Sequence, residues 1–326
     1  MNILIAGLTG SGKNLLSMRL AEVLKKKFQL EAEIVNADSV QIYRDLKIIA
    51  NHPTKSDFFA LPHHLYEILA PYENSSAAFW VEKAREIIRK LNAENKIAII
   101  CGGTGFYIDA LLHDISEIPT IPKEIRETVR LRYEKIGHEK FFDELRALDP
   151  VLTEKLHPNN TQRILRAYEV VLHTGKPLSE WWKNSKNFNA LYKKEESNIN
   201  SETISSFVLI PERSLLKNII VERTKKMIAS GAVEEIEEFI KNFPNYSGPL
   251  QKVIGFPEIK SMLNGEINSA DCVEKIITKT MQYAKRQSTW FRHQLPEAKI
   301  LQTFGYNEDL LTSISYIALM RSARKS

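Results

Sequence analysis

A phosphate-binding loop stands near the start of the chain. It follows the pattern G-x-x-x-x-G-K, and with the position after the lysine its residues are Gly7, Leu8, Thr9, Gly10, Ser11, Gly12, Lys13 and Asn14. Glycines let backbone N–H groups turn toward a bound anion, the helix that follows adds partial positive charge, and the lysine adds a full charge. The pattern therefore predicts a site for a di- or triphosphate.

The residue after the lysine departs from the usual form of this motif. Most such loops have Ser or Thr there, whose hydroxyl ligates Mg²⁺, whereas this chain has Asn14. Because an amide oxygen also ligates Mg²⁺, Asn14 is the candidate metal ligand.

Asp38, at the end of the apolar run 34–38, is the second residue that could do chemistry. Kinases and NTPases usually carry an acid after a later strand to organise the metal, but the apolar run at 97–101 is followed by Gly102 and Gly103. Asp38 is the only acid that ends a predicted strand. It suits either a metal ligand or a base that acts on a bound nucleophile.

Alternating strands and helices must position these residues. Apolar runs predict strands at 2–7, 34–38, 97–101 and 207–210, and helical periodicity predicts helices at 14–28, 77–92, 214–230, 232–242 and 270–293. Such patterns are the main sequence signal for these elements. Their alternation predicts an α/β fold with a P-loop NTPase-like parallel sheet covered by helices on both faces.

The middle of the chain has a different pattern. Residues 122–182 show helical periodicity and no convincing strand, and residues 187–206 are polar and predict an exposed loop. We therefore predict a core built from residues 1–112 and 201–326, and a helical insertion at 113–200 with the polar loop at its end.

The composition excludes several classes of protein. Of the 326 residues, 43% are apolar and 26% are charged, and the net charge of +5 tolerates a nucleic-acid partner without requiring one. Only two cysteines are present, which excludes a disulfide framework and fits the cytosol. No apolar run reaches the length of a membrane span. We expect a cytoplasmic protein without a membrane partner, and a monomer.

Beyond the phosphate loop, several segments resemble, in order, the tRNA dimethylallyltransferases, which are also called tRNA isopentenyltransferases. These segments are residues 38–44, 62–65, 102–105, 157–166, 174–179, 254–256 and 283–292. Their joint order is highly specific, and the resemblance extends over nearly the whole chain. The chain resembles the compact bacterial form of this family, because no Cys/His zinc-finger segment follows the core.

The resemblance implies a reaction that suits these residues. In this family the P-loop binds the diphosphate of dimethylallyl diphosphate, Mg²⁺ and cations neutralise the departing diphosphate, and N6 of adenosine 37 beside the anticodon attacks the allylic carbon. Asp38 matches the carboxylate that accepts an N6 proton, and Thr104 matches a threonine that helps to anchor the adenine. A placed carboxylate makes chemical sense because this amine is a poor nucleophile.

The resemblance also implies residues that contact the anticodon stem-loop of tRNA, mostly in the insertion. They are Asp38, Ser39, Val40, Gln41, Thr104, Arg126, Gln162, Arg163, Ile164, Leu165 and Arg166. Arg163 and Arg166 are three apart on a predicted helix and share a face. On the helix predicted at 270–293, Arg286 suits a phosphate contact, whereas Trp290 suits either a stacking platform for a base or the protein core.

Four departures from the family keep other interpretations open. Besides Asn14, Ile219 and Met281 stand where the family commonly has Arg, and residues 48–53 replace a segment that usually reads Ile-Gly-Thr-Ala-Lys-Pro. Lost cations weaken the binding and departure of a diphosphate, so one alternative is a catalytically impaired relative that still binds tRNA. The others are an adenine-nucleotide prenyltransferase, which would not need the insertion, and a P-loop kinase of small metabolites, which would not need the segment around Asp38.

Overall fold

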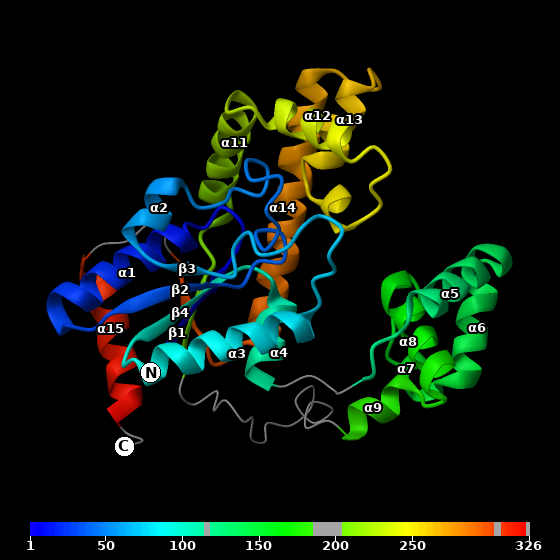
Figure 1. The fold of residues 1–326 in the computed structure, drawn as a ribbon, viewed down its shortest axis with the longest axis horizontal. Helices are drawn as coiled ribbons and strands as arrows, with labels where there is room; N and C mark the ends of the chain where they lie inside the picture. The colour runs from blue at the N-terminus through cyan, green and yellow to red at the C-terminus, as the bar shows by residue number, and fades with distance from the viewer. Residues whose placement is uncertain (114–117, 185–203, 303–307, 324–326) are drawn as a thin grey trace. The chain divides into compact units, whose positions relative to one another are not determined.

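A computed structural model of the chain describes residues 1–113, 118–184, 204–302 and 308–323 (Figure 1). The chain forms two compact units. The first consists of Met1–Leu111 and Asn200–Ser326, and the second of Leu112–Ile199. The polar loop predicted at 187–206 lies, up to residue 203, outside the described residues.

The first unit is built on one parallel sheet. Its strands are β1 (Asn2–Gly7), β2 (Ala32–Asn36), β3 (His63–His64), β4 (Ile97–Gly102), β5 (Ile204–Leu209) and β6 (Lys299–Leu301), in the spatial order β3-β2-β4-β1-β5-β6. Every neighbouring pair runs parallel, which confirms the predicted fold class. Strands that are buried on both faces read as continuous apolar runs, and this explains the sequence pattern.

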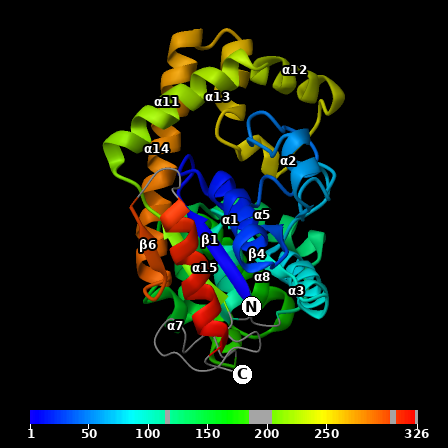
Figure 2. The same cartoon turned by 90° about the vertical axis from the view of Figure 1, so that its left-hand side faces the viewer.

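Helices cover both faces of this sheet, and further helices of the first unit lie beyond its strands. In chain order the helices of this unit are α1 (Lys13–Phe28), α2 (Lys55–Ala60), α3 (Ala77–Ala93), α4 (Gly105–His113), α11 (Arg213–Ala229), α12 (Ala232–Asn242), α13 (Phe256–Leu263), α14 (Ser269–Gln294) and α15 (Glu308–Ala323), with the 3₁₀ helix η2 at Pro249–Lys252. Figures 1 and 2 show α1 and α15 on one face of the sheet and α3 and α14 on the other. Leu20 of α1 and Ile314 of α15 share a buried cluster with Ile5 of β1. No helix in the described part of the chain is both long and apolar enough to cross a membrane.

The strand ends differ from the sequence prediction in informative ways. The strand predicted at 34–38 stops at Asn36, because the Asn36 side chain takes over the next backbone groups: its Nδ2 donates to the carbonyl of Asp38 (3.2 Å) and its Oδ1 accepts the Asp38 N–H (2.8 Å). The strand predicted at 207–210 begins earlier, at Ile204. The sequence pattern does not predict β3 and β6, because such short edge strands hold too few residues for a period.

The second unit consists, in its described ranges, of helices around a core of their own. They are α5 (Lys123–Ile136), α6 (His138–Leu148), α7 (Pro150–Thr153), α8 (Thr161–Thr174) and α9 (Leu178–Asn184). Phe141, Leu145 and Ile164 are among the residues buried between them. Asn160 starts α8 by accepting the N–H of Arg163 at 3.4 Å. The helical periodicity seen at 122–182 is thereby confirmed.

Asp149 joins two parts of the second unit, and its removal is expected to destabilise this unit. The residue is only 1% exposed, and its carboxylate accepts the N–H of Leu152 at 3.1 Å and of Ser179 at 2.9 Å. Asp149→Ala leaves both N–H groups without this acceptor, so we expect the free energy of unfolding to fall by about 2–4 kcal/mol. Urea unfolding of the full chain measures the change. The control Asp143→Ala removes an exposed carboxylate and should cost less than about 0.5 kcal/mol; equal losses would contradict the prediction.

Candidate active site

The phosphate loop, Asp38 and Thr104 lie at one edge of the sheet. They follow β1, β2 and β4, which are parallel neighbours whose carboxyl ends point the same way. This is the edge at which open α/β sheets bind ligands. Gly102 is required there, because a Cβ atom at this position would lie 2.2 Å from the backbone of Ala37.

The loop has the conformation needed to surround an anion. Gly10 and Gly12 have φ angles of 78° and 84°, in the left-handed region that favours glycine. Helix α1 begins at Lys13 without a side-chain cap, so its first N–H groups face the loop. The Lys13 Nζ donates to the carbonyl of Leu8 at 2.8 Å. Burial lowers the pKa of Lys13, while the nearby Asp38 carboxylate acts in the opposite direction.

Two residues from late in the chain complete the loop, and sequence reasoning missed both. Arg223 of α11 donates from Nη1 to Thr9 Oγ1 at 3.2 Å. Gln287 of α14 accepts the Thr9 N–H at 2.8 Å and donates to the carbonyl of Gly103 at 2.9 Å. Ile219, where the family commonly has Arg, lies one turn before Arg223 on the same helix. Residues at i and i+4 share one face of a helix, so this spacing could have indicated that Arg223 supplies the cation that Ile219 does not.

Asp38 and Thr104 belong to one hydrogen-bonded turn. The Asp38 Oδ1 accepts the N–H of Val40 at 2.8 Å and that of Gln41 at 3.4 Å. The Thr104 hydroxyl accepts the N–H of Ser39 at 2.9 Å and donates to its hydroxyl at 3.2 Å. The structure thus brings together the two residues predicted to be catalytic, and the predicted segment 38–41 forms the turn between them.

A carboxylate and two partly buried cations share this sheet edge. Burial lowers the pKa of Lys13 and of Arg223, and the charge of Asp38 counteracts burial in both cases. An arginine remains charged at every physiological pH. The arrangement therefore offers positive charge for an anionic leaving group beside a carboxylate that is able to accept a proton.

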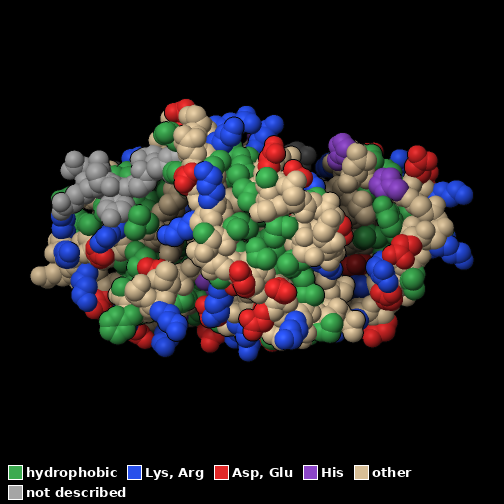
Figure 3. Space-filling model, turned by 90° about the horizontal axis from the view of Figure 1, so that it is seen from above, with side chains coloured by type: hydrophobic (Ala, Val, Ile, Leu, Met, Phe, Trp, Pro, Cys, Tyr) green, Lys and Arg blue, Asp and Glu red, His purple; other side chains and the backbone are tan. Residues whose placement is uncertain are grey.

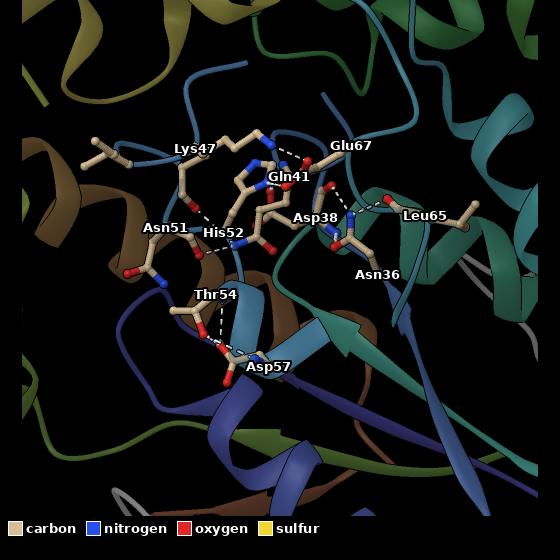
Figure 4. Close-up of polar contacts among 12 residues, drawn as sticks. Asn36, Asp38, Gln41, Lys47, Asn51, His52, Thr54, Asp57, Leu65 and Glu67 are labelled. Atoms are coloured by element: carbon tan, nitrogen blue, oxygen red, sulfur yellow. Dashed lines mark hydrogen bonds and ion pairs between the residues drawn. The ribbon is translucent and has the colours of Figure 1, made fainter. Parts of the chain in front are cut away.

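The connection between β2 and α3 is held in an unusual backbone conformation. Leu46, Asn51, Leu65 and Glu67 have φ angles of 59°, 53°, 62° and 55°. A non-glycine residue in this region costs about 1–3 kcal/mol and persists only where its surroundings enforce it, which occurs mostly at functional sites. In Figure 4, three of these residues surround the Asp38 turn.

Oxygen atoms that suit a metal ion are present at the phosphate loop. Asn14 Oδ1 and Ser11 Oγ are buried and find no hydrogen-bond partner among the described residues. The described part of the chain contains no group of three or more His, Cys, Asp or Glu side chains that could hold a metal. Mg²⁺ needs few protein ligands, since waters and phosphate oxygens supply the others. The donor atoms of this loop therefore fit a Mg²⁺ ion.

The residues predicted to bind tRNA on α8 divide into exposed and buried ones. Gln162 and Arg163 are exposed, and Arg166 is partly exposed with its Nη1 3.4 Å from Glu169. Ile164 is 0% exposed and packs in the core of the second unit. The predicted RNA contact of Ile164 is therefore corrected to a packing role, which the 3.6-residue period of the helix explains.

Two grooves, one in each unit, carry cations. The groove in the second unit has a volume of about 380 Å³ and is lined by Lys123, Arg126, Arg130 and Leu165, among others. The groove in the first unit, of about 750 Å³, follows α14 and is lined by Lys285, Arg286, Trp290 and His293, among others. On the face shown in Figure 3, basic and acidic side chains are interspersed. Binding of an RNA backbone would thus depend on local cations rather than on one basic field.

Trp290 has a place in both the core and the groove. Its ring lies against Gly105, where an added Cβ atom would be 2.5 Å away, and Gly105 directly follows Thr104. The residue is partly exposed and also lines the groove along α14. Both interpretations of Trp290 that the sequence left open are therefore compatible with its position.

Comparison with known proteins gives one consistent result. The IPP transferase family matches residues 41–294. A tRNA dimethylallyltransferase of Allorhizobium ampelinum is 36% identical over 295 residues, covering 90% of this chain and 92% of that protein. The crystal structure of a tRNA delta(2)-isopentenylpyrophosphate transferase from Staphylococcus epidermidis is 27% identical, with a TM-score of 0.66 and 99% of both chains covered. A eukaryotic dimethylallyltransferase acting on tRNA is 25% identical, with a TM-score of 0.78 over 99% of this chain and 79% of that chain. With matches of this extent, the chain belongs to the IPP transferase family.

Proposed function

We propose that the chain transfers a dimethylallyl group from dimethylallyl diphosphate to N6 of adenosine 37, next to the anticodon of tRNA, and so forms N6-(dimethylallyl)adenosine. The names of its relatives support this activity. The observation that carries the proposal is the Asp38 carboxylate beside the partly buried cations Lys13 and Arg223 at one edge of the sheet.

The phosphate loop and the two cations would hold the donor. Dimethylallyl diphosphate presents its anionic diphosphate to Lys13, to Arg223 and to the N–H groups at the start of α1. As the C–O bond to the diphosphate breaks, negative charge grows on the leaving oxygen, and fixed cations stabilise it most when water is excluded. Leaving-group stabilisation is therefore the main task of this half of the site.

Asp38 and Thr104 would serve the acceptor. The nitrogen of the exocyclic amine forms a bond to the allylic carbon while the C–O bond breaks, and the positively charged amine then loses one proton to the Asp38 carboxylate. Thr104 is hydrogen-bonded to the Asp38 turn through Ser39, so it is suited to fix the adenine beside the carboxylate. The base must leave its stack to reach this site, at a cost of about a few kcal/mol.

Asn14 would hold Mg²⁺, together with the neighbouring Ser11 hydroxyl. When bound, the ion would neutralise part of the charge of the diphosphate. The buried Oδ1 of Asn14, which has no partner within the described ranges, supports this assignment.

The anticodon stem-loop would contact the second unit through Arg126, Arg163 and Arg166, and the first unit through the groove along α14. Cations there neutralise phosphates, and an aromatic ring such as that of Trp290 offers a face for a splayed base. A free nucleotide has no use for these additional surfaces, which favours tRNA over an adenine nucleotide as the acceptor.

Transfer of radiolabel from dimethylallyl diphosphate tests the proposed function. The acceptor is tRNA from a strain that lacks the modification, with AMP as the competing acceptor and Mg²⁺ present. We expect label in N6-(dimethylallyl)adenosine of the tRNA and none in AMP. Tight tRNA binding without label, beside an active control enzyme, would instead identify an impaired relative, and label in AMP would identify a nucleotide prenyltransferase.

Substitution of Asn14 is expected to change the metal requirement. Asn14→Ala removes the candidate ligand, so we expect the Mg²⁺ concentration for half-maximal transfer to rise about tenfold, while Asn14→Thr, which restores the usual hydroxyl, should stay near the wild type. Titration of Mg²⁺ at a fixed donor concentration measures the effect, and EDTA should abolish transfer in all three proteins. An unchanged requirement in Asn14→Ala would exclude Asn14 as the ligand.

A further inference from the structure

We propose, on the basis of the proposed function, that Glu235 of α12 is a positioning residue for Asp38 and acts through residues 45–52 and Gln41. Glu235 lies outside every motif that the sequence offers. Its side chain is hydrogen-bonded to the connection between β2 and α3, and through this connection it is linked to the active site.

The Glu235 carboxylate holds the backbone of this connection. Its Oε1 accepts the N–H of Ile48 at 2.8 Å, and its Oε2 accepts the N–H of Ile49 at 3.1 Å. Burial raises the pKa of Glu235, whereas the backbone N–H groups lower it. A partly buried carboxylate is tolerated when its oxygens are hydrogen-bonded, so the side chain and the two N–H groups depend on each other.

Gln41 holds the same connection from the side of Asp38. Its Nε2 donates to the carbonyls of Ala50 at 3.0 Å and Asn51 at 2.7 Å, and its N–H lies 3.4 Å from Asp38 Oδ1. Figure 4 shows the Gln41 side chain between Asp38 and Asn51. Gln41 is among the residues that the family resemblance assigns to tRNA, and its side-chain amide donors are engaged within the protein.

Glu235 and Gln41 hold adjacent parts of the segment 45–52. Leu46 and Asn51 of this segment both have a left-handed backbone, with φ angles of 59° and 53°, which is costly for leucine and better tolerated by asparagine. Such a conformation relaxes when the contacts that enforce it are removed. Without Glu235 the segment would relax, Gln41 would lose its partners, and the turn that carries Asp38 would move. The phosphate loop would keep its position, because it has its own contacts to Gln287 and Arg223.

Glu235→Gln tests this role, because it keeps the size of the side chain but replaces one acceptor oxygen by a donor. We expect kcat for transfer to tRNA to fall about 10- to 100-fold, the loss that a small misplacement of a reacting group causes. The KM for dimethylallyl diphosphate should be unchanged. Glu238→Gln, an identical change at an exposed position of α12, is the matched control and should behave as the wild type. Glu235→Asp keeps both oxygens and should retain more activity than Glu235→Gln.

A double-mutant cycle with Gln41→Met separates positioning from general damage. If both residues hold one segment, either substitution releases it, and the double variant should be about as slow as the slower single variant. Assays run well below the melting temperature of each variant. Multiplied effects of the two substitutions, an unchanged kcat in Glu235→Gln, or less activity in Glu235→Asp than in Glu235→Gln would each overturn the proposal. Failure of the wild type to label tRNA would refute the proposed function instead.

Discussion

Asp38→Asn is expected to slow prenyl transfer about 10²- to 10⁴-fold, the usual contribution of a placed general base. The substitution is conservative for the fold, because the Asn Oδ1 can still accept the N–H of Val40 and keep the turn. What it removes is the capacity to take a proton from the amine. Single-turnover transfer with saturating donor measures the rate, and filter binding measures the affinity for tRNA, which should remain close to the wild type.

Asp57→Asn is a matched control for this prediction. Asp57 accepts the N–H of Thr54 at 2.7 Å at the start of α2 and has no part in the proposed reaction. The Asp57→Asn substitution should therefore leave the rate of transfer unchanged. A loss of tRNA binding as large as the loss of rate in Asp38→Asn would mean that Asp38 supports the RNA site rather than the chemistry.

Removal of either cation from the phosphate loop is expected to lower kcat/KM for dimethylallyl diphosphate about 10²- to 10³-fold. Lys13→Met and Arg223→Met keep much of the side-chain volume but leave the diphosphate without one positive partner. Arg223→Lys, which keeps the charge but loses the planar fork, should lie between Arg223→Met and the wild type. Initial rates over a range of donor concentrations at saturating tRNA give these values.

Lys225→Met provides the control for both cations. Lys225 is an exposed lysine of α11 that pairs with Glu222 at 3.0 Å, so its loss should not affect the donor. The KM for tRNA should also be unchanged in Lys13→Met and Arg223→Met. An unaltered dependence on the donor in these two variants would place the diphosphate elsewhere in the protein.

Much of the scaffold follows from local patterns in the sequence. Continuous apolar runs predicted the interior strands β1, β2, β4 and β5, and the 3.6-residue period predicted most of the long helices. The phosphate loop was recognisable because its glycines, its lysine and the flanking strand and helix all lie within a short stretch of chain. Asp38 was found for a similar reason, since it closely follows one of these strands.

What the sequence could not give is the set of contacts between distant segments. Arg223 and Gln287 meet Thr9 only because α11 and α14 cross the end of the sheet, and no local pattern records that crossing. A family motif also does not distinguish the two faces of a helix. For this reason Ile164, in the middle of the segment assigned to tRNA, is a core residue.

The place of β1 in the sheet has a consequence for how the protein is made. β1 pairs with β4 on one side and with β5 on the other, so that Asn2 lies opposite both Ala98 and Ile204. The whole second unit is synthesised after β4 and before β5. Its buried cluster is built entirely from this one stretch of chain. During translation the second unit can therefore complete its core while the strand that leads into the phosphate loop still has an open edge. An open strand edge is a template for association with other chains. Slow folding of the second unit would thus reduce the yield of active enzyme through aggregation at the ribosome, even when the finished protein is stable.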